Sequence, residues 1–342
     1  MQSVAGLKGE RIMPCSDRRK LAALAVVAIA VLGDGAIYAQ GDAKATNNLP
    51  NPYRPVENWA QLPAGMEWGQ VISVQPDAHG NIWVFHRKDP PILKFDRTGK
   101  LIKSFGAGMF VQPHGLTVDR DGNIWVTDQS AKDGKGEQAI KFSPEGQVLM
   151  TLGKAGVAGS GTDTFNGPCD VAVAANGDVF VADGHGGDTN ARVVKFSKDG
   201  KFIKAWGKKG SGPGEFDTLH RMAMDSKGRL FVADRGNSRI QIFDQDGNFI
   251  AQWRQFGRPS GIFISKDDTL YSVDSQSDET TNPGVKRGIR IGSAKDGSVK
   301  AFIPDSSPNP QIALAEGVSA DAKGDIYAAG VSSMGLHKFV KK

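Results

Sequence analysis

Two histidines and a glutamate are the residues of this 342-residue chain whose types and spacing point most directly to chemistry. His114, His220 and Glu316 each stand eight residues before the glycine of a short phrase that recurs along the chain. They occupy equivalent positions in three repeats, so in a closed ring of repeats they would point toward one axis. Two neutral imidazoles and one carboxylate, with an open fourth position, form the ligand set of a catalytic zinc site. The sequence therefore predicts a Zn²⁺ site on these residues; its alternative is a set of polar side chains lining a water-filled channel.

The same position holds Cys169 and Ser260 in two other repeats. A cysteine there could be a soft metal ligand or a small buried packing residue. The first repeat has two extra residues in its turn and offers only Val71 or Ile72 at this position.

Arg87, His185 and Arg235 are predicted to be catalytic. The two arginines share one repeat position in the first and fourth repeats, opposite each other across a ring, and each follows the second strand of its repeat. Paired guanidiniums at one mouth could hold a carboxylate bidentately, and structural arginines are the alternative. His185 lies in the glycine-rich sequence GHGGD, which gives it room to reach the axis, although an exposed loop histidine would have the same sequence. We assign no role to His79 or His337.

The elements that must position these residues are six copies of one phrase, each followed by a second phrase. GNIWV occurs at 80–84 and 122–126, and GDVFV, GRLFV, DTLYS and GDIYA begin at 177, 228, 268 and 324. The second phrase is seen as ILKFDRTGK, which ends at Lys100. Both phrases alternate apolar and polar residues between Asp-Gly or Asn-Gly turns, a pattern typical of consecutive antiparallel strands. Steps of 40 to 56 residues suit four short strands with variable loops.

We therefore predict an all-β fold, a six-bladed β-propeller with four-stranded antiparallel blades. The sixth repeat ends with a third strand at Leu336–Val340, and Met66–Gly69 resembles a missing fourth strand. We expect this N-terminal strand to complete the last blade and close the ring, because closure removes exposed sheet edges. The predicted propeller covers residues 66–342, preceded by a lead-in over residues 42–65.

Two further repeat positions are interpreted as structural. Aromatic residues at one of them are predicted to pack between blades. Aspartates at the other are predicted to anchor turns and strand ends rather than to act in catalysis. The aromatic residues are Trp83, Trp125, Phe180, Phe231, Tyr271 and Tyr327, and the aspartates are Asp128, Asp183, Asp234 and Asp274.

The N-terminus resembles a secretory signal peptide over residues 1–41. Basic residues at 18–20 precede the apolar stretch 21–32, and small residues suited to cleavage lie between about 39 and 45. A membrane anchor is the alternative, but the apolar stretch is too short to span a bilayer, so we expect no stable membrane insertion after cleavage. The predicted location is secreted or periplasmic. The net charge is +5, and the basic residues form no dense Lys/Arg block, so we expect no nucleic-acid partner. We also expect the protein to be a monomer.

The repeats resemble NHL repeats, and their arrangement is similar to that of peptidyl-α-hydroxyglycine α-amidating lyases. The residues that carry the resemblance are VFHR at 84–87, PHGLTVDRDGNIWVTD at 113–128 and the stretch 165–243. In that family three histidines hold zinc; two of them match His114 and His220, and the third falls on Glu316. The family's catalytic arginine matches Arg87.

The same resemblance places the family's second active-site arginine at Arg235 and its catalytic tyrosine at His185. Its calcium-binding carboxylate would fall on Gly317, so calcium is not carried over. The resemblance implies a zinc-dependent lyase that cleaves the C–N bond of a carbinolamide to an amide and glyoxylate. Its substrate would be a small molecule or peptide derivative with a carboxylate, and His185 would be the base. The alternatives are a metal-dependent hydrolase such as a lactonase, and a non-catalytic extracytoplasmic binding propeller.

Overall fold

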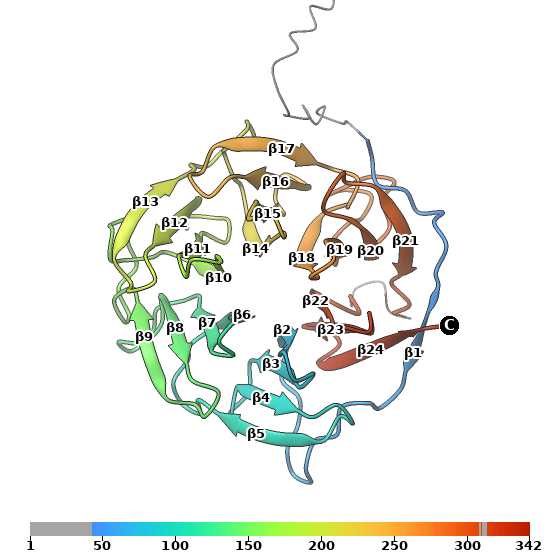
Figure 1. The fold of residues 1–342 in the computed structure, drawn as a ribbon, viewed down its shortest axis with the longest axis horizontal. Coiled ribbons are helices and arrows are strands. Elements are labelled where there is room, and N and C mark those ends of the chain that lie inside the picture. Colours follow the sequence, from blue (N-terminus) through green and yellow to red (C-terminus); the bar gives the residue numbers. More distant parts are fainter. Residues whose placement is uncertain (1–42, 308, 310–312) are drawn as a thin grey trace, which may run out of the picture. The chain divides into compact units, whose positions relative to one another are not determined.

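The computed structural model describes residues 43–307, 309 and 313–342. The described strands form six four-stranded antiparallel sheets arranged around a central axis (Figure 1). This confirms the predicted all-β, six-bladed propeller. The predicted signal peptide, residues 1–41, lies outside the described residues. Within the described part, no helix has the length and apolar character needed to cross a membrane.

The first three blades each run from the axis outward in chain order. Blade 1 consists of β2 (Val71–Pro76), β3 (Ile82–His86), β4 (Ile92–Phe95) and β5 (Leu101–Phe105). Blade 2 consists of β6 (Pro113–Val118), β7 (Ile124–Asp128), β8 (Gln138–Phe142) and β9 (Val148–Leu152). Blade 3 consists of β10 (Pro168–Val173), β11 (Val179–Asp183), β12 (Arg192–Phe196) and β13 (Phe202–Trp206).

Blades 4 and 5 repeat this order, and blade 6 takes its outer strand from the N-terminal side of the chain. Blade 4 consists of β14 (Leu219–Met224), β15 (Leu230–Asp234), β16 (Arg239–Phe243) and β17 (Phe249–Trp253). Blade 5 consists of β18 (Pro259–Ile264), β19 (Thr269–Asp274), β20 (Gly288–Ser293) and β21 (Val299–Pro304). Blade 6 consists of β22 (Gly317–Ala320), β23 (Ile326–Gly330), β24 (Gly335–Lys341) and β1 (Tyr53–Val56).

An N-terminal strand closes the ring, as predicted, but the strand is a different one. β1 pairs antiparallel with β24, with Tyr53 opposite Lys341. The predicted closing segment, Met66–Gly69, is not a strand, and this part of the prediction is wrong. Its Trp68 ring stacks on Phe95 with ring centroids 5.7 Å apart. The segment's apolar residues therefore serve packing on blade 1, while the free edge of β24 is covered by β1, which belongs to the stretch predicted as a lead-in.

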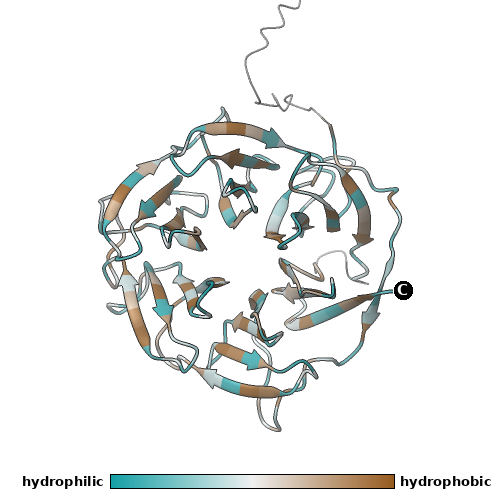
Figure 2. Cartoon of the chain, in the orientation of Figure 1, coloured by the Kyte–Doolittle hydropathy of each residue, from teal (hydrophilic) through white to brown (hydrophobic). Residues whose placement is uncertain are grey.

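The repeated aromatic residues pack between neighbouring blades, which confirms their predicted role. All six are at most 5% exposed. Trp83 packs with Leu116 and Val126 of blade 2, and Tyr327 packs with Val74 of blade 1 across the closure. The strands are banded brown and teal in Figure 2, as expected when one side chain in two is buried. Each interblade contact buries apolar surface that a single sheet could not cover alone.

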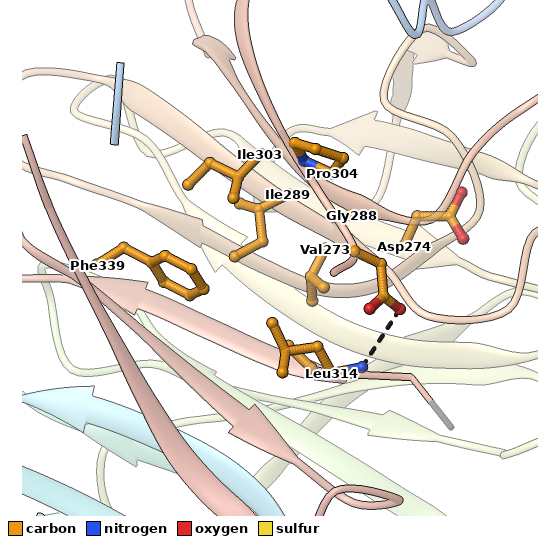
Figure 3. Close-up of a pocket in the computed structure, with 10 residues that line it drawn as sticks. Val273, Asp274, Gly288, Ile289, Ile303, Pro304, Leu314 and Phe339 are labelled. Atoms are coloured by element: carbon orange, nitrogen blue, oxygen red, sulfur yellow. Dashed lines mark hydrogen bonds between the residues drawn. The ribbon is translucent and has the colours of Figure 1, made fainter. Parts of the chain in front are cut away.

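The interface between blades 5 and 6 leaves little empty space at the site drawn in Figure 3. Figure 3 shows Val273, Ile289, Ile303, Leu314 and Phe339 gathered between blades 5 and 6. The cavity among them is about 10 Å³, room for one water at most. This site is therefore a packing defect rather than a ligand pocket.

The repeated aspartates anchor the loops that lead into the inner strands. Asp128 accepts hydrogen bonds from the backbone N–H groups of Val111 and Gln112. Asp234 accepts one from the N–H of Asp217 at 3.0 Å and also pairs with Arg239 at 2.8 Å. The prediction of structural anchors is confirmed, and these anchors set the position of the loops around the channel mouth.

The Arg239→Met variant tests this framework. Arg239 is 1% exposed and donates to the Asp234 carboxylate, to Gln252 and to three loop carbonyls. Removing it leaves the Asp234 carboxylate buried without its charged partner, so we expect a loss of about 3–5 kcal/mol in the free energy of unfolding. Chemical denaturation measures this loss, provided that the variant and the wild type have the same m-value. Arg97→Met, at an exposed position, is the control. Equal stabilities for the two variants would contradict the anchoring role.

Candidate metal centre and its mouth

The ring of residues predicted from the repeats forms at the start of the inner strands. His114, Cys169, His220 and Ser260 are each the second residue of their inner strand, and Glu316 directly precedes β22. In blade 1 the position is held by Ile72. In β2, β6, β10, β14 and β18 the pairing with the second strand is interrupted at this residue. Such a bulge re-aims the side chain of the extra residue, here toward the axis.

Three histidines meet on the axis. His114, His185 and His220 have ring nitrogens that all lie within 4.8 Å of one another. The Nε2 atoms of His114 and His185 are 3.1 Å apart. Two of the three come from inner strands, whereas His185 comes from the loop between β11 and β12. This triad can bind a metal ion.

Backbone hydrogen bonds determine the tautomers of the two inner-strand histidines. The Nδ1–H of His114 donates to the carbonyl of Cys169 at 2.7 Å, and the Nδ1–H of His220 donates to the carbonyl of Ser260. Both Nε2 atoms therefore present lone pairs to the axis, as metal-ligating imidazoles do. Nε2 of His220 is buried and has no hydrogen-bond partner among the described residues. A cation between these lone pairs would satisfy all of them.

A tight glycine loop brings His185 into the triad. Gly184 has φ of 134°, and a Cβ there would overlap the carbonyl of Asn190, so only glycine fits. The N–H of His185 donates to Thr189 Oγ1 at 2.7 Å, which holds the loop. Burial, followed by the charge of Arg235, lowers the pKa of His185 to about 3. The imidazole is neutral near pH 7, which suits a metal ligand and makes it a weak proton acceptor.

Glu316 lies beside the triad, in contact with one histidine and one arginine. Its Oε1 is 3.3 Å from Nε2 of His220 and 3.0 Å from Nη1 of Arg235. Nη2 of Arg235 is 3.5 Å from Nε2 of His185. The structure thus brings five of the predicted site residues into contact: His114, His185, His220, Glu316 and Arg235. Whether Glu316 is a metal ligand stays a prediction.

Arg87 lies at the mouth without a carboxylate partner among the described residues. Its Nε donates to the carbonyl of Pro113 at 3.1 Å, and its Nη1 donates to Gln70 Oε1 at 2.9 Å. With the carboxamide of Gln112 turned to accept, Nη1 and Nη2 both lie 3.3 Å from its oxygen. Burial lowers the pKa of Arg87, and the more distant Glu316 opposes this. Arg87 is therefore oriented by neutral groups.

Cys169 is fully buried, and its Sγ lies 3.3 Å from the carbonyl of Leu219. Burial raises the pKa of the Cys169 thiol well above its usual value. A neutral thiol among backbone carbonyls fits the packing role rather than that of a soft ligand.

Arg221 was not predicted as a site residue, yet its buried guanidinium crosses the channel next to the triad and contacts the backbone carbonyl of His114. It is buried, pairs with Asp170 at 3.3 Å, and donates from Nη2 to the carbonyls of Ile72 and His114. One guanidinium thus ties the inner strands of blades 1 to 4 together. Below it the channel widens to a cavity of about 180 Å³. The sequence held a signal for Arg221 at the repeat position that directly follows His114 and its equivalents. Three of the six residues at that position are glycines, and only Asp170 and Arg221 are charged.

Comparisons with known proteins agree with this architecture. The NHL repeat family model matches residues 110–132 and 216–243. Peptidyl-glycine α-amidating monooxygenase B of Xenopus laevis is 38% identical over an alignment of 201 positions, which covers 49% of this chain and 22% of that protein. Peptidyl-α-hydroxyglycine α-amidating lyase 2 of Drosophila melanogaster is 31% identical over 247 residues, 62% of this chain and 57% of that protein. The chain thus spans about a fifth of the length of the first relative and a little more than half of the length of the second.

A solved gluconolactonase from Xanthomonas campestris superimposes with a TM-score of 0.58 at 17% identity, covering 81% of this chain and 87% of that one. At this identity the likeness shows the fold alone. By its topology the chain is a six-bladed β-propeller with a histidine-lined channel, and two of its stretches match the NHL repeat model. Its sequence is similar to those of peptidyl-α-hydroxyglycine α-amidating lyases.

Proposed function

We propose that this propeller is a zinc-dependent carbon–nitrogen lyase that cleaves an α-hydroxyglycine-type carbinolamide to an amide and glyoxylate. The observation that supports this most is the convergence of three imidazoles beside the paired side chains of Arg235 and Glu316, with two of the imidazoles oriented by backbone carbonyls. Relatives whose sequences match about half of the chain or a little more are named as amidating enzymes. Fold alone would not support a reaction, so the proposal depends on the site.

The triad fits a divalent metal better than it fits an empty channel. The Nε2 atoms of His114 and His185 lie 3.1 Å apart, and the buried Nε2 of His220 makes no hydrogen bond within the described part of the chain, so a cation bound here would satisfy it. We infer that His114, His185 and His220 hold the ion, with the Glu316 carboxylate beside it. A bound Zn²⁺ supplies Lewis acidity, which favours loss of a proton from the substrate hydroxyl.

Arg87 is proposed to hold the substrate carboxylate. Its guanidinium is oriented by Gln70, Gln112 and Pro113, none of which neutralises its charge. A carboxylate that docks on it gains charge-assisted hydrogen bonds without displacing an acid of the protein. Arg235, by contrast, is already paired with Glu316.

Glu316 is proposed to move the proton. In the reaction the hydroxyl loses its proton, the C–N bond breaks with its electron pair going to nitrogen, and the nitrogen gains a proton. The low pKa of His185 makes it a poor acceptor, although it was the predicted base. Glu316 Oε1 is held by Arg235, so its second oxygen can accept the hydroxyl proton and return it to the amide nitrogen. No other reactant is required.

The surroundings of the reaction are also part of the proposal. We propose that the protein is exported through the N-terminal segment, works as a secreted or periplasmic monomer, and acts on a small or peptide-derived substrate. Nucleic acid is not proposed as a partner, because the positive charges of the chain form no dense block.

Glyoxylate release tests the function directly. The purified protein is loaded with Zn²⁺, and its metal content and glyoxylate production from an N-acyl-α-hydroxyglycine are measured together. We expect about one zinc per chain and enzyme-dependent glyoxylate. Stoichiometric zinc without glyoxylate, but with lactone hydrolysis, would favour the hydrolase. Absence of zinc under zinc-replete conditions would contradict both enzymes and favour a binding propeller.

A further inference from the structure

Arg87 and Arg235 occupy one repeat position but have different partners. In each case the backbone N–H bonds to the residue that precedes the inner strand of the same blade: Arg87 to Gln70 O at 2.9 Å, and Arg235 to Thr218 O at 2.8 Å. Their side chains then diverge. Arg235 pairs with the Glu316 carboxylate, whereas Arg87 contacts amide and carbonyl oxygens.

The two carboxamides around Arg87 come from equivalent positions in adjacent blades. Gln70 directly precedes β2, and Gln112 directly precedes β6. Each is anchored through its backbone: Gln70 O accepts from the N–H of Arg87, and the N–H of Gln112 donates to Asp128 Oδ1 at 2.6 Å. With the carboxamide of Gln112 turned to accept, both side-chain oxygens lie within hydrogen-bond distance of the same guanidinium, at 2.9 Å for Gln70 and 3.3 Å for Gln112.

Two carboxamides can orient the guanidinium of Arg87 without neutralising its positive charge. A carboxylate at either position would orient Arg87 equally well, because Glu and Gln have the same shape and both accept hydrogen bonds. It would also form a charge-assisted pair and compete with an incoming anion. Carboxamides accept the same hydrogen bonds and leave the positive charge available.

We propose that Gln70 and Gln112 are positioning residues that make Arg87 a selective receptor for the substrate carboxylate. This rests on the proposed function, in which Arg87 binds that carboxylate. The two glutamines thereby determine that the enzyme accepts acids of the α-hydroxyglycine type and discriminates against their neutral amides or esters.

The test uses Gln70→Glu and Gln112→Glu in the full-length protein. Binding of an uncleavable N-acylglycine and of its neutral N-acylglycinamide is measured by calorimetry, and KM and kcat are measured with the N-acyl-α-hydroxyglycine. We expect the acid to bind about tenfold more weakly to each variant and KM to rise similarly, with kcat and amide binding nearly unchanged. Gln70→Met should weaken acid binding less, because it loosens Arg87 without neutralising it.

Gln276→Glu is the matched control. Gln276 is exposed at the same mouth and accepts from Arg258 Nε at 3.4 Å, so the variant adds an equal charge beside a different arginine. An equal loss of acid binding in this control would overturn the proposal, since the effect would then be long-range. Unchanged acid binding in Gln70→Glu and Gln112→Glu would also overturn it.

These outcomes are separate from failure of the proposed function. If the wild-type protein binds acid and amide alike and releases no glyoxylate, the proposed function itself fails. If the wild type prefers the acid and the glutamate variants keep that preference, only the role of the glutamines fails. Thermal unfolding of each variant confirms that binding is measured on folded protein.

Discussion

His220→Ala is expected to lose the bound metal and to lower kcat/KM for glyoxylate release by roughly 10³-fold or more. The imidazole of His220 is fully buried, its Nδ1–H is bonded to the Ser260 carbonyl, and its Nε2 faces the axis without a hydrogen-bond partner among the described residues, 3.3 Å from Oε1 of Glu316. Alanine removes this ligand and leaves a gap that no neighbouring side chain of the same chemistry fills. His114→Ala should behave alike. Metal content by elemental analysis and steady-state kinetics measure both effects.

His79→Ala is the control, because His79 is exposed in a turn between β2 and β3. It should retain metal and activity. Two further variants test whether His185 or Glu316 is the third metal ligand. We expect His185→Ala to lose zinc, and we expect Glu316→Gln to keep zinc but to lose activity. The reverse result would support the ligand set predicted from sequence, with Glu316 in place of His185. Full metal retention in His220→Ala would contradict the metal centre.

Arg87→Met is expected to lower kcat/KM by about 10²–10³-fold while the protein keeps its metal. The change removes a guanidinium that is oriented by three neutral acceptors, so its loss strands no carboxylate of the protein and should cost little stability. The loss is of the size expected for one charge-assisted pair with the substrate. Kinetics with the acid and with its neutral amide, together with zinc analysis, measure it.

Arg235→Met is the matched comparison at the same repeat position. It removes the partner of the Glu316 carboxylate and so should affect both turnover and stability. Arg87→Lys should recover part of the activity, because it restores charge without the bidentate geometry. Equal losses for the acid and the neutral amide in Arg87→Met would show that Arg87 does not bind the carboxylate.

Much of the architecture could be predicted because it repeats. The alternation within the phrase beginning at Gly122 recurs in every blade, and so does the buried aromatic exemplified by Trp125. The position eight residues earlier could be located for the same reason, and the structure places His114 and His220 there on the axis. Periodic patterns report the backbone geometry that all six copies share.

The closing strand could not be predicted as reliably, because strand-like sequence does not specify a partner. Met66–Gly69 resembles an outer strand, yet Trp68 packs on Phe95, and Tyr53–Val56 pairs with β24 instead. Which segment reaches a free edge depends on the path of the chain around the ring, a non-local property.

Side-chain contacts that do not repeat from blade to blade could not be predicted from the sequence for a related reason. Arg221 spans from blade 4 to carbonyls of blades 1 and 2, and the contact of Arg235 with Glu316 joins residues 81 apart. Such contacts depend on side-chain lengths and loop paths across the axis, which have no period in the sequence.

The histidines, glutamate and arginines around the axis show which features could be predicted from the sequence and which could not. The six-bladed propeller, the inward register of His114, His220 and Glu316, and the mouth position of Arg87 and Arg235 could all be derived from the repeats. The folded structure was needed to show that His185 joins the two inner-strand histidines, that Glu316 pairs with Arg235, and that Arg87 has no carboxylate partner among the described residues. The reason is physical: register follows from local backbone periodicity, whereas ligand sets and charge compensation depend on which loop side chains reach the axis.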